Sequence, residues 1–205
     1  ELIVAELADV LSLAVPGRAV VSVPFGIPSH DENDELRDLL ARSAGLNVGF
    51  AVLESARNLT RPEYERVPLD VAATTLWLDL LVQNLDRTPA NPNIMVRRGV
   101  YWLIDHGAAL SFHHDWRGVT EQSPRLAYDV AGHVFGWSAP VLPNVHAMVS
   151  ARLTREAIAQ AVSVVPDELL QQSVEAALDP NRHRAMYAAW LWKRRQWMEE
   201  ALREG

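Results

Sequence analysis

The chain has no cysteine, and Lys193 is the only lysine among its 19 basic residues. The lack of cysteine excludes disulfides, thiol nucleophiles and thiolate metal sites, and it fits a reducing compartment, so we expect a cytoplasmic protein. No run of about 18 uncharged apolar residues is present, which predicts that no segment spans a membrane. The apolar start ELIVAELADVLSLAV carries three acidic residues and no basic ones, unlike a signal peptide.

Positive charge is also scarce. The 205 residues include 26 acidic and 19 basic side chains, a formal net charge of −7. This balance argues against binding to nucleic acid by this chain alone, or to an anionic membrane surface. The ten glycines nowhere form a Gly-rich phosphate loop. The remaining composition, 49% hydrophobic and 22% charged, is that of an ordinary globular protein.

Hydrophobic periodicity and turn residues predict an α+β fold. Residues 1–54 are expected to form a small part with a helix and short strands, and residues 55–205 a mostly helical larger part that is helical beyond Trp116. The run from Lys193 to Arg195 in the last helix is expected to be a solvated face. Helices are predicted at 2–13, 31–44, 70–85, 167–178 and up to 204, and strands at 18–23, 48–53, 94–96 and 100–104.

A polar loop, NLDRTPANPN, follows the helix at 70–85 and precedes the predicted hairpin. Because a hairpin folds back on itself, Asp105 at its end should return close to Asp86 in the loop. Two carboxylates about 5 Å apart repel by roughly 3 kcal/mol at an effective dielectric of 20, and a divalent cation removes that repulsion. The amide oxygen of Asn91 beside Asp105 is a hard oxygen set suited to Mg²⁺, which leaves Asp86 as a candidate base.

The run Asp86-Arg87-Thr88-Pro89-Ala90-Asn91-Pro92-Asn93, followed by Ile104-Asp105-His106-Gly107, resembles the catalytic core of the HipA-like kinases and, more distantly, of the phosphatidylinositol kinases. Protein kinases share the logic of a catalytic Asp, an Asn five positions later, and an Asp-Phe-Gly after a short hairpin. The resemblance implies that Asp86 orients or deprotonates an acceptor hydroxyl, and that Asn91 and Asp105 hold the Mg²⁺ of ATP. Asn93 is the second choice as a metal ligand. Arg87, the second catalytic candidate, would contact phosphate or pair with Asp86 or Asp105.

The resemblance extends more weakly to the rest of the chain. It implies that Glu1 or Glu6 stands for the glutamate that pairs with a nucleotide-binding lysine, and that Phe50, Ala51 and Val52 lie at the hinge that meets adenine. The implied fold is protein-kinase-like and two-lobed, with a truncated small lobe and a mostly helical large lobe. The acceptor would be a protein Ser or Thr or a small alcohol, and an antitoxin or regulatory protein is an expected kind of partner.

Departures from the kinase pattern leave alternatives open. No lysine precedes the first helix, so either the first strands of the small lobe are missing from this chain, which we favour, or the protein is a pseudokinase that binds a partner. The pair His114-Asp115, with His106 and His113 nearby, is also compatible with the metal centre of an HD-type phosphohydrolase. We favour ordinary loop histidines, with His106 packed or hydrogen-bonded beneath the metal site.

Overall fold

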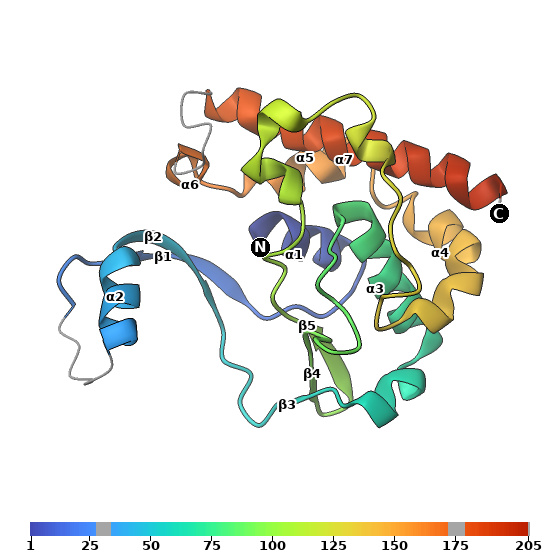
Figure 1. Ribbon diagram of the computed structural model, residues 1–205, viewed down its shortest axis with the longest axis horizontal. Helices are drawn as coiled ribbons and strands as arrows, with labels where there is room; N and C mark the ends of the chain where they lie inside the picture. Colours follow the sequence, from blue (N-terminus) through green and yellow to red (C-terminus); the bar gives the residue numbers. More distant parts are fainter. Residues whose placement is uncertain (28–33, 172–178, 205) are drawn as a thin grey trace.

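The computed structural model describes residues 1–27, 34–171 and 179–204 (Figure 1). The α-helices are α1 (Leu2–Val10), α2 (Asp34–Arg42), α3 (Leu69–Val82), α4 (Leu142–Val149), α5 (Arg155–Ser163), α6 (Asp167–Gln171) and α7 (Pro180–Glu204). Short 3-10 helices are η1 (Arg61–Arg66), η2 (Ser111–His114), η3 (Trp116–Gly118), η4 (Ser123–Arg125) and η5 (Gly136–Val141). The strands are β1 (Arg18–Val23), β2 (Gly45–Phe50), β3 (Arg57–Asn58), β4 (Ile94–Arg97) and β5 (Val100–Leu103).

The core is built around α3. Every residue of α3 from Thr75 to Val82 is buried, so α3 is an interior helix and not a surface helix with one apolar stripe. It packs against α1, α4, η5 and α7, and α1 also packs against α5. Figure 1 shows α1 and α3 in the middle of the helical body, with α7 running along one side. The C-terminal end of α3, where the polar loop begins, therefore lies inside the molecule.

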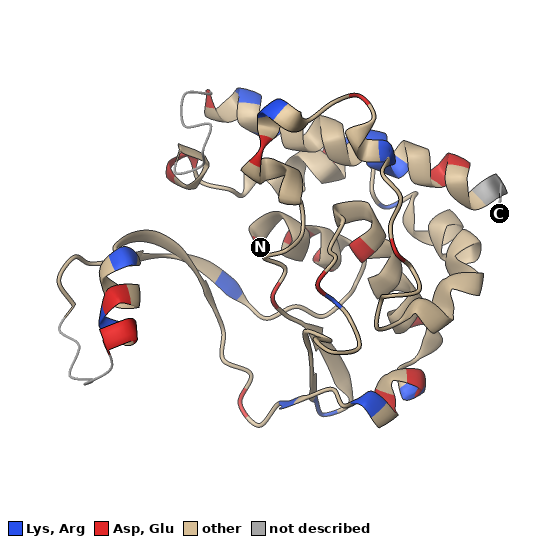
Figure 2. Ribbon diagram, viewed as in Figure 1, with Lys and Arg blue, Asp and Glu red and all other residues tan. Residues whose placement is uncertain are grey.

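Two small antiparallel sheets adjoin this helical body. β1 and β2 pair from Arg18 with Phe50 to Val23 with Gly45, and Figure 1 shows this ribbon projecting from the body together with α2. Figure 2 shows charges of both signs on α2, which buries no residue. The second sheet has the order β3-β4-β5, and β4 and β5 form the predicted hairpin. Gly99 turns this hairpin at a φ of 77°, a conformation that favours glycine.

The predicted α+β class is confirmed, and several helix ends differ from the prediction. The first helix ends at Val10, because Ser12 takes a left-handed φ of 62° and cannot continue it. The helix predicted at 70–85 begins at Leu69 and ends at Val82, where Gln83 is left-handed with a φ of 53°. The chain thus leaves α3 earlier than predicted and turns towards the polar loop.

The predicted strand at 48–53 and the predicted helical region beyond Trp116 are partly corrected by the structure. β2 runs from Gly45 to Phe50, so the strand predicted at 48–53 begins earlier than predicted and its residues 51–53 lie outside the sheet. The chain beyond Trp116 forms only short 3-10 turns until α4, which corrects the prediction of continuous helix there. Residues 172–178 of the predicted helix lie outside the described residues. The predicted boundary near residue 54, between the small and the large part of the chain, stays a prediction. In the described ranges, no helix has the length and apolar composition needed to cross a membrane.

The prediction of a solvated basic face on α7 is wrong for Arg194. Its guanidinium is fully buried and donates to the carbonyl oxygens of Leu80, Pro124 and Leu126. Its neighbour Arg195 donates to the carbonyl of Ser150. Both arginines therefore hydrogen-bond to backbone carbonyls of segments that are distant in the sequence. These bonds link α7 to the rest of the fold.

Candidate functional site

The loop after α3 brings three polar side chains together. The Oδ2 of Asp86 accepts hydrogen bonds from the amide nitrogens of Asn91, at 2.8 Å, and Asn93, at 3.2 Å. Thr88 and Asn91 exchange backbone hydrogen bonds at 3.1 Å, which closes the loop on itself. Asp86 therefore faces both asparagines with one oxygen engaged.

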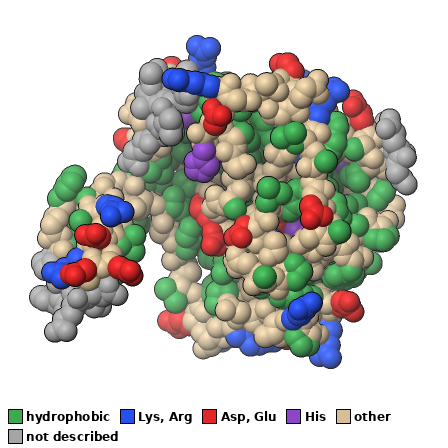
Figure 3. Space-filling view, viewed as in Figure 1, with side chains coloured by type: hydrophobic (Ala, Val, Ile, Leu, Met, Phe, Trp, Pro, Cys, Tyr) green, Lys and Arg blue, Asp and Glu red, His purple; other side chains and the backbone are tan. Residues whose placement is uncertain are grey.

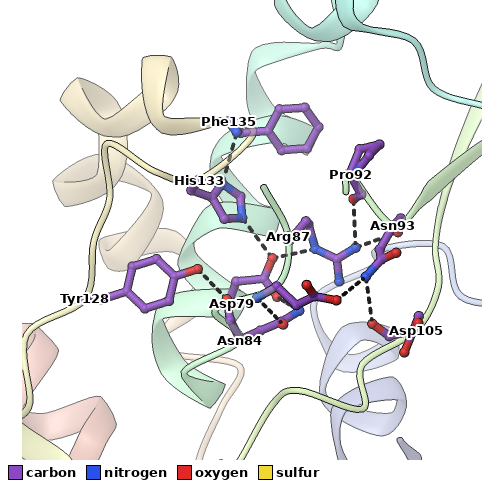
Figure 4. A network of polar contacts seen from close by, with 10 residues as sticks. Asp79, Asn84, Arg87, Pro92, Asn93, Asp105, Tyr128, His133 and Phe135 are labelled. Atoms are coloured by element: carbon purple, nitrogen blue, oxygen red, sulfur yellow. Dashed lines mark hydrogen bonds and ion pairs between the residues drawn. The ribbon is translucent and has the colours of Figure 1, made fainter. Parts of the chain in front are cut away.

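Asp105 returns to this loop after β5, as the hairpin predicts. The backbone N–H of Ile104 donates to the carbonyl of Asn93 at 3.0 Å, and the Asn93 amide nitrogen lies 3.5 Å from the carbonyl oxygen of Asp105. Asp105 is exposed and adopts a left-handed φ of 51°, and its carboxylate accepts the N–H of Gly107 at 3.4 Å. Figure 4 shows Asn93 between the loop and Asp105. The four predicted polar residues, Asp86, Asn91, Asn93 and Asp105, thus lie in one place.

Arg87 is placed differently from a residue that contacts substrate. Its side chain is fully buried, with Nε donating to Asp79 at 2.6 Å and Nη1 donating to the carbonyl of Asn93 at 2.6 Å (Figure 4). Because protein atoms enclose the guanidinium, phosphate cannot reach it in this arrangement. The expected ion pair does form, but with Asp79 in the interior and not with Asp86 or Asp105.

Asp79, near the end of α3, is the centre of a buried polar network that the sequence analysis missed. One oxygen accepts from Arg87 and from His133 Nε2 at 2.9 Å, and the other accepts from Asn84 Nδ2 at 3.0 Å. Burial acts to raise the pKa of the Asp79 carboxyl, but the charge of Arg87 and the bond from His133 outweigh it, and the pKa falls to about 2. Asp79 is thus an ionised interior carboxylate.

A cavity of about 340 Å³ opens beside the site. Its walls are largely apolar and come from α1 and the segment after it, the end of β2 and the segment after it, and the hairpin, and Asp105 is the carboxylate in the lining. The predicted hinge residues Phe50, Ala51 and Val52 all line it. This size and lining suit a flat, mostly apolar ligand with a few polar atoms. The full lining is Ala5, Val15, Pro16, Phe50, Ala51, Val52, Leu53, Met95, Leu103, Ile104, Asp105 and His106.

The comparison with protein families decides between the alternatives at the level of family. A family model described as HipA-like kinase matches residues 1–193. The chain belongs to the HipA-like kinase family. No curated protein and no solved structure matches it. Kinase chemistry is therefore the framework for a site made of Asp86, Asn91, Asn93 and Asp105.

In this HipA-like kinase the two candidate glutamates have local partners. Glu1 Oε2 lies 3.3 Å from Nδ1 of the buried His106, and it borders a second cavity, not the one that Phe50 lines. Burial acts to raise the pKa of Glu1, but the hydrogen bonds and charge of His106 and the charge of the N-terminal amino group together outweigh it, and the pKa is lowered. Glu6 instead pairs with Arg18. Glu1 therefore contacts the loop that carries Asp105. It does not line the cavity of Phe50, Ala51 and Val52, which we call the hinge cavity.

The histidines do not form the metal centre of the phosphohydrolase alternative. His113 and His114 bond to each other, Nε2 to Nε2, at 3.0 Å, while Asp115 caps η3 by accepting the N–H of Gly118 at 3.1 Å. Among residues 1–27, 34–171 and 179–204, no three His, Asp or Glu side chains gather where they could share a metal ion. The pair His114-Asp115 is therefore turn structure.

The oxygen donors around Asp86 fit Mg²⁺. Asn91 and Asn93 both use their amide nitrogens on Asp86, which leaves each Oδ1 available, and the exposed Asp105 carboxylate adds a charged ligand. Mg²⁺ takes one or two such protein oxygens and completes its shell with water and phosphate. Figure 3 shows acidic side chains gathered in the middle of one face, with no Lys or Arg atoms visible among them. That negative potential also favours a cation.

Proposed function

We propose that this HipA-like kinase transfers the γ-phosphoryl group of ATP to a hydroxyl acceptor. The observation that carries the proposal is the convergence of Asp86, Asn93 and Asp105, the last of which also lines a largely apolar cavity. Catalysis of phosphoryl transfer is mainly positioning and charge stabilisation, and this arrangement offers a proton acceptor and hard oxygen ligands beside a nucleotide-sized pocket.

Adenine would occupy the cavity along Phe50, Ala51 and Val52. The Ala51 N–H is already used by the carbonyl of Gly17 at 2.7 Å, whereas the Val52 N–H has no hydrogen-bond partner within the described residues. Val52 therefore supplies the free backbone donor for a ring nitrogen. The phosphates would then lie towards Asp105, the carboxylate in the lining of the same cavity.

Asp86 acts as the base or orienting group. Its Oδ2 is held by Asn91 and Asn93, and its Oδ1 makes no hydrogen bond within the described part of the chain. In the proposed step the acceptor oxygen bonds to the γ-phosphorus, and the bond to the β–γ bridging oxygen breaks. That electron pair leaves with ADP, and the acceptor proton passes to Asp86 Oδ1.

Asn93 and Asp105 would hold Mg²⁺, with Asn91 as a further ligand. When bound, this ion neutralises charge on the phosphate oxygens. Asn93 contacts both Asp86 and the backbone of Asp105, whereas Asn91 contacts only Asp86 within this set. We therefore reverse the order expected from spacing and rank Asn93 first. The acceptor is proposed to be a Ser or Thr of a protein, with a small alcohol as the alternative, and an antitoxin or regulatory protein as a partner.

Calorimetric titration of ATP, with and without Mg²⁺, tests the nucleotide site. We expect binding that strengthens with Mg²⁺, and Asp105→Asn should weaken the Mg²⁺-dependent part at least about tenfold, since it removes a charged ligand. Asp70→Asn, the same change at an exposed residue of α3, is the control and should leave binding unchanged. Equal affinities for all three proteins, or no binding by the wild type, would contradict the proposal.

Transfer is tested by phosphate release from ATP and by phosphorylation of added Ser- or Thr-containing protein. Asp86→Asn should keep Mg²⁺-dependent ATP binding and lose transfer, about 100-fold or more.

One observation favours a second candidate, a pseudokinase that binds nucleotide without transfer. Lys193, the only lysine, lies on α7 and pairs with Glu121 at 2.5 Å. Wild-type binding with no phosphate release and no phosphorylation would support that candidate.

A further inference from the structure

The Asp79 carboxylate is connected to the whole length of the loop that carries Asp86. Asn84 donates to Asp79 and, through its own Oδ1, accepts the backbone N–H of Asp86 at 3.3 Å. Arg87 donates to Asp79 and also to the carbonyl of Asn93 at 2.6 Å. Through Asn84 and Arg87, one interior carboxylate therefore fixes the backbone N–H of the proposed base, Asp86, and the backbone carbonyl of the first-ranked metal ligand, Asn93.

A second segment holds the same network from the other side. His133 donates to Asp79 at 2.9 Å, and the next residue, Val134, donates its backbone N–H to the carbonyl of Arg87 at 3.0 Å. Tyr128 donates its hydroxyl to the carbonyl of Asn84 at 2.5 Å. The loop is thus clamped between the end of α3 and residues 128–134, as the dashed lines in Figure 4 show.

The negative charge of Asp79 is needed to balance the positive charge of Arg87, which is buried beside it. Both side chains are fully excluded from solvent, and the positive charge of Arg87 has no other carboxylate partner among the described residues. A buried cation without its counter-charge is strongly disfavoured, so loss of the Asp79 charge should move Arg87. Since Arg87 holds the Asn93 carbonyl, that movement reaches the catalytic loop.

We propose that Asp79 is a positioning residue that sets the relative placement of Asp86 and Asn93 through Arg87, Asn84 and His133. This inference rests on the proposed kinase function for its catalytic consequence. Asp79 touches neither the hinge cavity nor the predicted metal ligands' side chains. Its loss should therefore affect turnover and leave nucleotide affinity nearly unchanged.

The first test compares Asp79→Asn with Asp70→Asn, an exposed position on the same helix, by ADP formation from MgATP in the presence of the added Ser- or Thr-containing protein. Asp79→Asn should lower kcat about 100-fold, because displacement of reacting groups by about 1 Å has that order of effect. The KM for ATP should stay within about twofold, since the hinge cavity is untouched. A kcat within twofold of wild type, or a rise in KM that accounts for the whole loss, would overturn the inference.

A second variant addresses the possibility that Asp79→Asn does not fold. Tyr128→Phe removes only the hydroxyl that holds the Asn84 carbonyl, and it should lower kcat several-fold with an unchanged KM and a melting temperature lowered by only roughly a few degrees. Wild-type kcat in a folded Tyr128→Phe protein would count against the clamp.

Hydrogen exchange at the amides of Thr88 and Asn91 separates failure of this inference from failure of the proposed function. These amides bond within the loop, and their exchange should accelerate at least about tenfold in Asp79→Asn, or in Tyr128→Phe if the former does not fold. Asp70→Asn should match the wild type. Faster exchange in a protein that forms no ADP from MgATP and does not phosphorylate added protein would retain the positioning role and refute the kinase proposal, whereas unchanged exchange would refute the positioning role.

Discussion

The guanidinium of Arg194 on α7 donates its Nε hydrogen to the carbonyl of Leu80 on α3 at 3.0 Å, across 114 residues of sequence. It also binds the carbonyls of Pro124 and Leu126, and it lies over the ring of Trp197 at 4.6 Å. Burial lowers the pKa of Arg194 to about 10, so it remains protonated at neutral pH. The single buried cation of Arg194 thus links α7 to α3. It also links α7 to the segment of Pro124 and Leu126, which leads to Tyr128.

Arg194→Met should therefore destabilise the protein strongly. The change removes this donor from the buried carbonyls of Leu80 and Pro124 and from the part-buried carbonyl of Leu126, and we expect a loss of about 3–5 kcal/mol in the free energy of unfolding. Urea denaturation measures it, with Arg182→Met, an exposed position on the same helix, as the control that should cost less than about 0.5 kcal/mol. Similar midpoints for both variants would contradict this account of α7.

Acid should weaken the fold partly through Asp79. Its pKa is lowered from 3.8 to about 2, so at pH values between these the unfolded chain binds the proton more readily than the folded one. The stabilisation is complete above pH 4 and is lost as the pH falls towards 2, by roughly 2 kcal/mol. Unfolding measured from pH 5 to 2 should show a smaller pH dependence in Asp79→Asn than in Asp70→Asn. Identical slopes would mean that Asp79 is not the group responsible.

The convergence of Asp86 with Asp105 could be predicted because it depends on local signals. A polar loop and a short hairpin around Gly99 are visible in consecutive residues, and a hairpin necessarily returns its end to its beginning. The turn residues therefore carried most of the information about the candidate site. The same holds for the apolar helix before the loop, although its last turn was misplaced.

The anchoring of that loop could not be predicted in the same way. Asp79 appears in the sequence as one acid within an apolar helix, and its partner His133 lies 54 residues further on. Likewise, Arg194 looks like part of an exposed basic run. Burial of a charge depends on partners that tertiary packing brings from afar, so periodicity assigns such residues to the surface by default. One signal was available: Asp79 interrupts the apolar run LWLDLLV, in a helix with little room for a solvated face.

Gly136 is required by close packing at the first residue of η5. A Cβ added there would lie 2.4 Å from the carbonyl oxygen of Val130, a contact with backbone that no side-chain rotation relieves. Gly136→Ala should therefore cost about 1–3 kcal/mol in the free energy of unfolding. Gly17→Ala is the matched control, since its new Cβ would meet only Ala51 at 3.6 Å, an ordinary contact. Thermal melts of the two variants compare the sites, and a lower melting temperature for Gly17→Ala would contradict this reasoning.

His113 should titrate well below the usual range of a histidine side chain. Burial is the main cause that lowers its pKa, followed by the charge of His114, and the pKa falls from 6.5 to about 4. His113 should thus stay neutral at pH 5, where its Nε2 remains bonded to His114, and the folded state should weaken as the pH falls from 6.5 towards 4, since the unfolded chain takes up the proton first. Proton NMR of the imidazole resonances measures this directly. His114→Ala should raise the pKa of His113 only in part, because burial remains; a value near 6.5 in the wild type would show that the ring is open to solvent.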